Sequence, residues 1–180
     1  MEKIIDAVPT EDIIKELTEE RFVRKTNFGH NEIYVVNAHN APNTMREIGR
    51  LREWAFRESG GGTGKSIDID EFDTRDEAYF EQLIVWDPKE KEILGGYRFI
   101  NCDKLKKKNN GQVDTPTSEL FYYSDEFIDN YLPYTIELGR SFIQPKYQST
   151  GNVRKSIFTL DNLWDGLGAL TVIMPNVKYL

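Results

Sequence analysis

The stretch Tyr134-Thr135-Ile136-Glu137-Leu138-Gly139-Arg140-Ser141-Phe142-Ile143 decides how the rest of the chain is interpreted. It has the composition of a strand, yet it places Glu137 and Arg140 in a mostly apolar run. A charge inside a central strand is costly unless it is paired or used. Two interpretations therefore stay open for these charges, a buried structural network and a functional site.

The side chains of a strand alternate between its two faces. One face would carry Ile136, Leu138, Arg140 and Phe142, and the other would carry Glu137, Gly139, Ser141 and Ile143. Under this alternation Glu137 and Arg140 can serve one cleft only if the strand bulges near Gly139. The bulge is a geometric prediction that a structure can contradict.

The bulk composition is that of a globular protein. Hydrophobic residues make up 39% and charged residues 29% of the 180 residues. The formal net charge of −7 argues against a general nucleic-acid binder, because neutralising phosphates requires an excess of Lys and Arg. Local basic groups remain at residues 104–108 and at Lys146, Arg154 and Lys155.

Three features of the sequence predict a cytoplasmic location. Cys102 is alone, so no intrachain disulfide can form and a reducing compartment is expected. No apolar run approaches the roughly 18–20 residues that cross a bilayer. Residues 1–12 lack the apolar core of a signal peptide. Peripheral contact with the inner face of the membrane is left open.

The chain predicts a single α/β (α+β) domain in two parts. Residues 1–40 would hold a first helix and the first strands, and residues 41–180 the core. The core pattern predicts helices at 42–56, 124–131 and 156–174, and strands at 80–86, 92–100 and 134–143. This order implies a mixed, mostly antiparallel central sheet flanked by helices. Another strand begins at 177–180, so we expect the domain to continue beyond Leu180 and this chain to lack its C-terminal part.

The glycine-rich segment Gly60-Gly61-Gly62-Thr63-Gly64-Lys65-Ser66 resembles a phosphate-binding loop only in part. The P-loop spacing requires Gly five residues before Gly64, where Ser59 stands. A P-loop also follows a strand, whereas this segment follows a helix. We therefore expect a glycine-rich loop without a nucleotide.

Five polar motifs follow one another along residues 45–180. They are Arg52 to Phe56, Asp70 to Asp73, Gly95 to Arg98, Tyr122 to Phe127 and Glu137 to Ser141. Each alone is typical of an ordinary salt bridge, but their order resembles that of the GNAT-fold long-chain N-acyltransferases. Those enzymes make ornithine and glycine lipids, and some carry an old "haemolysin" label. A more distant similarity extends to the acyl-homoserine-lactone synthases.

The resemblance implies an N-acyltransferase. It would move a long-chain (3-hydroxy)acyl group from acyl carrier protein or coenzyme A to the amine of a small amino acid, in aminolipid synthesis. The thioester is then a cosubstrate, and neither a bound cofactor nor a metal is expected. The alternatives are a signal synthase like the homoserine-lactone enzymes and a GNAT-like domain that binds acyl thioesters without turnover.

The resemblance also assigns residues. Glu137 is expected to deprotonate the amine, with Arg98 and Arg140 beside it. Either arginine can bind an acceptor carboxylate or pair with Asp70 and Asp73 to fix a loop over the cleft. Arg52 joins this acceptor or loop-positioning group, although helical periodicity alone places it on a solvated face.

The acyl donor is expected to bind in the segment after the opening strand. This segment follows the pattern Gln-x-x-Gly-x-Gly/Ala except at Val153, and the start of the next helix can hold phosphate. The basic groups are candidate docking points for the acidic carrier protein. The donor-binding residues are Gln148, Gly151, Asn152, Arg154, Lys155 and Ser156.

Overall fold

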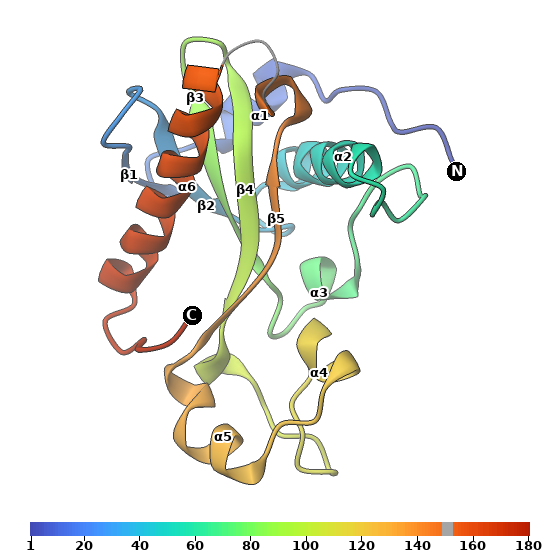
Figure 1. Ribbon diagram of the computed structural model, residues 1–180, viewed down its shortest axis with the longest axis vertical. Helices are drawn as coiled ribbons and strands as arrows, with labels where there is room; N and C mark the ends of the chain where they lie inside the picture. Colours follow the sequence, from blue (N-terminus) through green and yellow to red (C-terminus); the bar gives the residue numbers. More distant parts are fainter. Residues whose placement is uncertain (149–152) are drawn as a thin grey trace.

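The protein is built on one antiparallel sheet of five strands in the order β1-β2-β3-β4-β5 (Figure 1). The computed structural model describes residues 1–148 and 153–180, without the side chains of residues 153–157. The strands are β1 (Phe22–Lys25), β2 (Glu32–Val36), β3 (Glu81–Asp87), β4 (Glu92–Asn101) and β5 (Ile136–Ile143).

Helices cover both faces and one end of the sheet. α2 and α6 lie on opposite faces, and α4 and α5 lie at the lower end in Figure 1. The helices are α1 (Thr10–Glu16), α2 (Pro42–Glu58), α3 (Glu71–Thr74), α4 (Pro116–Leu120), α5 (Asp125–Asn130) and α6 (Val153–Ile173). Short 3₁₀ turns at Cys102–Lys104, Leu132–Tyr134 and Pro145–Tyr147 join them. Along the described part of the chain, no helix combines the length and apolar character needed to cross a membrane.

The apolar run of β3 is explained by cover on both faces. Leu83 and Val85 pack in the cluster under α6, whereas Ile84 and Trp86 pack in the cluster under α2. Because successive side chains point to opposite faces, a strand covered on both sides is apolar at every position. A third cluster, containing Phe80 and Ile100, fills the end of the sheet toward α5.

Gly95 and Gly96 allow the central strands to approach closely. A Cβ atom at Gly96 would lie 2.5 Å from the carbonyl oxygen of Leu83, and one at Gly95 would lie 2.6 Å from that of Phe142. Neither distance is tolerable against backbone, so only glycine fits. The glycine pair thus marks a close backbone approach on both sides of β4.

The bulge predicted near Gly139 is present. Gly96 pairs with Phe142 and Arg98 with Gly139, so Arg140 and Ser141 of β5 together oppose one residue of β4. Arg140 adopts a positive φ of 51°. The extra residue inverts the alternation beyond it, and Phe142 consequently packs under α2, whereas Ile136 lies in the cluster under α6. Strict alternation was therefore wrong for Phe142.

The predicted order of elements is otherwise confirmed, with shifted boundaries. The last helix begins at Val153, three residues before the predicted position 156. β1 and β2, which lie in residues 1–40, belong to the same sheet as β3, β4 and β5. Within the described residues, parallel pairing is limited to an isolated bridge between Thr135 and Tyr179.

Candidate active site

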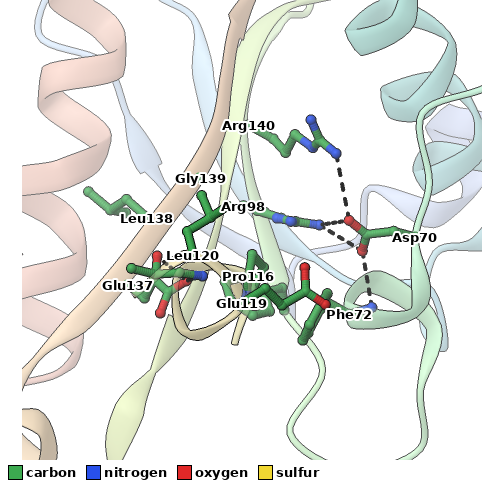
Figure 2. Close-up of a pocket in the computed structure, with 12 residues that line it drawn as sticks. Asp70, Phe72, Arg98, Pro116, Glu119, Leu120, Glu137, Leu138, Gly139 and Arg140 are labelled. Atoms are coloured by element: carbon green, nitrogen blue, oxygen red, sulfur yellow. Dashed lines mark hydrogen bonds and ion pairs between the residues drawn. The ribbon is translucent and has the colours of Figure 1, made fainter. Parts of the chain in front are cut away.

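A cavity of about 350 Å³ lies beside the bulged strand and is partly covered by α4. Figure 2 shows Arg98 and Arg140 extending toward Asp70, while Glu137 lies near Leu120. Segments far apart in the sequence thus meet in one place. The lining residues are Asp70, Phe72, Phe80, Arg98, Pro116, Thr117, Glu119, Leu120, Glu137, Leu138, Gly139 and Arg140.

Arg52 is fully buried behind this cavity rather than solvated on α2. Its Nη1 lies 3.2 Å from Oδ2 of Asp73, and its Nη2 donates a hydrogen bond to Oε1 of Gln82. Gln82 in turn donates through Nε2 to Oδ1 of Asp73 at 2.9 Å. The prediction of a solvated face was wrong because Asp73 of α3 neutralises the guanidinium and Gln82 of β3 accepts a hydrogen bond from it.

Arg98 is bound to the aspartates. Its Nη1 donates to both carboxylate oxygens of Asp70, at 2.8 and 2.7 Å, and lies 3.4 Å from Oδ2 of Asp73. Asp70 also caps α3 by accepting from the backbone N–H of Phe72. Burial opposes the charged form of Asp70, but Arg98 outweighs it and lowers the pKa of Asp70. Of the two interpretations of Arg98, the structure has the loop-fixing one.

Arg140 is held much more loosely. Its Nη2 lies 3.4 Å from Oδ1 of Asp68 and 3.8 Å from Oδ2 of Asp70, and it makes no hydrogen bond to any described residue. Asp68 is 2% exposed, and burial raises its pKa against the opposing charge of Arg140. Sequence reasoning missed Asp68. Its spacing of two from Asp70 in an extended segment was the available signal.

Glu137 is half-buried at the opposite end of the cavity from Asp70 (Figure 2). Its Oε1 accepts hydrogen bonds from the hydroxyl of Thr117 at 2.9 Å and from the backbone N–H of Thr117 at 3.2 Å. Its Oε2 has no hydrogen bond to a described residue. Thr117 was also missed, because no sequence pattern links a threonine of α4 to a carboxylate twenty positions later.

The predicted donor-binding residues are only partly described. Gln148 is exposed and donates through Nε2 to the carbonyl oxygen of Ile143. Gly151 and Asn152 lie outside the described residues. Arg154, Lys155 and Ser156 fall in the first turn of α6, where only the backbone is described.

A second cavity of about 280 Å³ lies where β5 ends and α6 begins. Apolar side chains of α2, β5 and α6 form most of its wall, and Gln148 closes one side. This cavity is a candidate place for the acyl donor. It is lined by Ala55, Phe56, Ser59, Ser141, Phe142, Ile143, Gln148, Leu160 and Leu163.

The proposed carrier-docking lysines are already paired with acids. Lys106 lies 2.8 Å from Glu77, and Lys146 lies 2.8 Å from Glu92. Such exposed ion pairs contribute little to the free energy of unfolding, so these lysines can readily exchange one acidic partner for another. The remaining pairs are Lys104–Glu81, Lys107–Asp129 and Lys108–Asp114.

The glycine-rich loop is held by an internal carboxylate. Glu53 is fully buried and accepts hydrogen bonds from the backbone N–H groups of Thr63 and Gly64, both at 2.9 Å. Arg57 completes the set through Nη2, 2.7 Å from Glu53. Glu53 thus occupies amides that a phosphate would need, in agreement with the expectation of no nucleotide.

The comparisons with known proteins agree with this architecture. Residues 51–156 match the family described as Acetyltransferase (GNAT) domain, and the chain belongs to that family. It is 58% identical over 179 residues to a glycine N(alpha)-acyltransferase of Bacteroides thetaiotaomicron, covering 99% of this chain and 53% of that protein. It is 54% identical over 179 residues to a glycine N(alpha)-acyltransferase of Phocaeicola vulgatus, covering 99% and 55%. The chain thus spans about half the length of these curated relatives. No solved structure matches it.

Proposed function

We propose that this chain carries the site of an N-acyltransferase that moves an acyl group from a thioester to the amine of glycine or a similarly small amino acid. The observation that carries the proposal is Glu137, a half-buried carboxylate on the bulged strand beside an open cavity, with one oxygen that no described residue hydrogen-bonds. Membership of the GNAT family and the names of the two relatives support it.

The chemistry requires a deprotonated amine. In this proposal the free Oε2 of Glu137 takes a proton from the acceptor ammonium, directly or through water. The nitrogen lone pair then attacks the thioester carbonyl, the C–N bond forms, and the C–S bond breaks to release the thiol. Backbone N–H groups near the bulge supply contacts for the developing oxyanion.

The acyl donor would lie in the cavity lined by Phe142 and Leu163, next to the start of α6. Free amides at a helix N-terminus favour phosphate groups, which both coenzyme A and carrier-protein pantetheine have. The long-chain 3-hydroxyacyl group, the acyl carrier protein and the role in aminolipid synthesis come from the family resemblance and are part of the proposal. So are a cytoplasmic location and peripheral membrane contact.

The test compares the protein with its Glu137→Gln variant. Each is given 3-hydroxyacyl coenzyme A or acyl carrier protein together with glycine, and thiol release and the N-acyl product are measured by mass spectrometry. We expect Glu137→Gln to lower kcat by about 10²- to 10⁴-fold, as removal of a general base does, with the melting temperature unchanged. The matched control is Glu126→Gln, an exposed carboxylate on α5.

Two outcomes would overturn the proposal: no N-acyl product from any tested amino acid, or full activity in Glu137→Gln. The same assay separates the rivals. A product that depends on S-adenosylmethionine indicates a signal synthase, and thioester binding without thiol release indicates a non-catalytic domain.

A further inference from the structure

Two arginines, Arg98 and Arg140, line the cavity, and their terminal nitrogens differ in how they are hydrogen-bonded. The side chain of Arg98 is 4% exposed and donates twice to Asp70. The side chain of Arg140 is 33% exposed and forms only ion pairs at 3.4 and 3.8 Å. The Nε atoms of both are buried and lack a partner among the described residues. Within the described structure, neither terminal nitrogen of Arg140 therefore makes a hydrogen bond, whereas Arg98 uses Nη1 for Asp70 and Asp73.

The pairing of the charges around the cavity also distinguishes Arg140 from the other arginines. Arg52 and Arg98 are matched by Asp70 and Asp73 in hydrogen-bonded pairs. Arg140 faces Asp68, whose Oδ2 is buried with no partner among the described residues. The ion pairs of Arg140, at 3.4 and 3.8 Å, are longer than the 3.2 Å pair of Arg52 with Asp73 and the 2.7 Å pair of Arg98 with Asp70. Arg140 is the most loosely paired of these three arginines.

The backbone holds Arg140 in place at a cost. A φ of 51° lies in the left-handed region, which is unfavourable for a residue with a Cβ atom. Strain of this kind persists where the surrounding structure enforces it, often at functional sites. Here the bulge turns Arg140 to the same cavity as Glu137, which strict alternation forbids.

We propose that Arg140 binds the carboxylate of the acceptor while Glu137 receives the proton of its amine. This inference rests on the proposed function and narrows its acceptor to α-amino acids with a free carboxylate. The terminal nitrogens of Arg140 accept the carboxylate as a charge-assisted pair. Arg98 remains bound to Asp70 and takes no part in acceptor binding.

The first test measures binding and needs no turnover. Titration calorimetry compares N-hexanoylglycine with N-hexanoylglycinamide, which differ only in the charged carboxylate. We expect the protein to bind the carboxylate at least about tenfold more tightly, equal to about 1.4 kcal/mol. In Arg140→Gln the two ligands should bind equally. Arg46→Gln, an exposed arginine of α2, should keep the preference.

A second variant distinguishes a loss of carboxylate binding from a loss of the folded structure. Arg140→Lys keeps a positive charge facing Asp68 but lacks the planar fork, so it should fold and retain only part of the preference. Thermal unfolding of both variants is recorded beside the titrations. The proposal is wrong if Arg140→Gln keeps the full preference, or if the unmodified protein shows none.

An activity assay separates this inference from the proposed function. The kcat/KM ratio of glycine to glycinamide should fall toward one in Arg140→Gln, through a higher KM for glycine, while the KM for the acyl donor stays constant. If the protein acylates both acceptors and the ratio does not change in the variant, only the role of Arg140 fails. If it acylates neither while the carboxylate preference in binding holds, only the proposed reaction fails.

Discussion

The cavity at the bulged strand has two sides that differ in how their charges are used. On the closed side, formed by Arg52, Asp70, Asp73, Gln82 and Arg98, each charged group has a hydrogen-bonded partner. On the open side, formed by Thr117, Glu137 and Arg140, one carboxylate oxygen and one guanidinium have no hydrogen bond within the described structure. The closed side is a hydrogen-bonded scaffold, and under the proposed function the open side is the part that binds the acceptor.

The largest expected effect tests the closed side. Arg52→Met removes a fully buried cation and leaves Asp73, itself 0% exposed, without its main partner. Breaking such a pair costs about 3–5 kcal/mol, which should appear as a lower free energy of unfolding in urea. The control is Arg46→Met on the same helix. A loss below about 1 kcal/mol would mean that the closed side is not structural.

A smaller effect is expected on the open side. Thr117→Val removes the hydroxyl that donates to Glu137 at 2.9 Å and keeps the side-chain shape. We expect kcat to fall about tenfold, corresponding to about 1.4 kcal/mol, with an unchanged free energy of unfolding.

Thr117→Ser keeps the hydroxyl and serves as the matched control. It should restore the rate. If Thr117→Val instead lowers the melting temperature and leaves kcat unchanged, Thr117 is only a structural contact of α4.

The smallest effect is the pH dependence of the free energy of unfolding, to which Asp70 and Asp68 contribute with opposite signs. The pKa of Asp70 is lowered on folding, so its contribution is present above 3.8 and is lost as the pH falls through its folded value. The pKa of Asp68 is raised on folding, so its contribution is present below 3.8 and is lost as the pH rises through its folded value. In Asp70→Asn the free energy of unfolding should therefore decrease less steeply as the pH is lowered. Asp68→Asn should not reduce this decrease.

This comparison is measured by urea unfolding at several values between about pH 2 and about pH 6. Asp129→Asn, an exposed carboxylate of α5, is the control. Equal acid slopes in Asp70→Asn and the unmodified protein would contradict the pairing of Asp70 with Arg98.

Much of the fold could be predicted because its causes are local. The strands alternate or are continuously apolar, the glycine pair marks a close approach, and the helices show their periodicity. The bulge was also predictable, since two charges within four residues cannot otherwise serve one cleft. Phe142 could not be placed on its face without knowing where the extra residue lies.

The site was less predictable because its partners are distant in sequence. Arg52 is neutralised by Asp73 and hydrogen-bonded to Gln82, which lie twenty-one and thirty positions further on. Helical periodicity reports only how residues of one helix relate to each other, so it placed Arg52 in solvent. Asp68 and Thr117 carry no motif, and their contacts arise only when separate segments meet.

The sequence by itself determined the order of elements, the glycine pair and the need for a bulge, because each follows from neighbouring residues. It also assembled the polar motifs that indicate the family. Only the tertiary structure decided that Arg98 is bound to Asp70 while Arg140 stays loosely held. The same residue type received two roles because the energy of a guanidinium depends on burial and on the acids within reach, and these are properties of the folded chain.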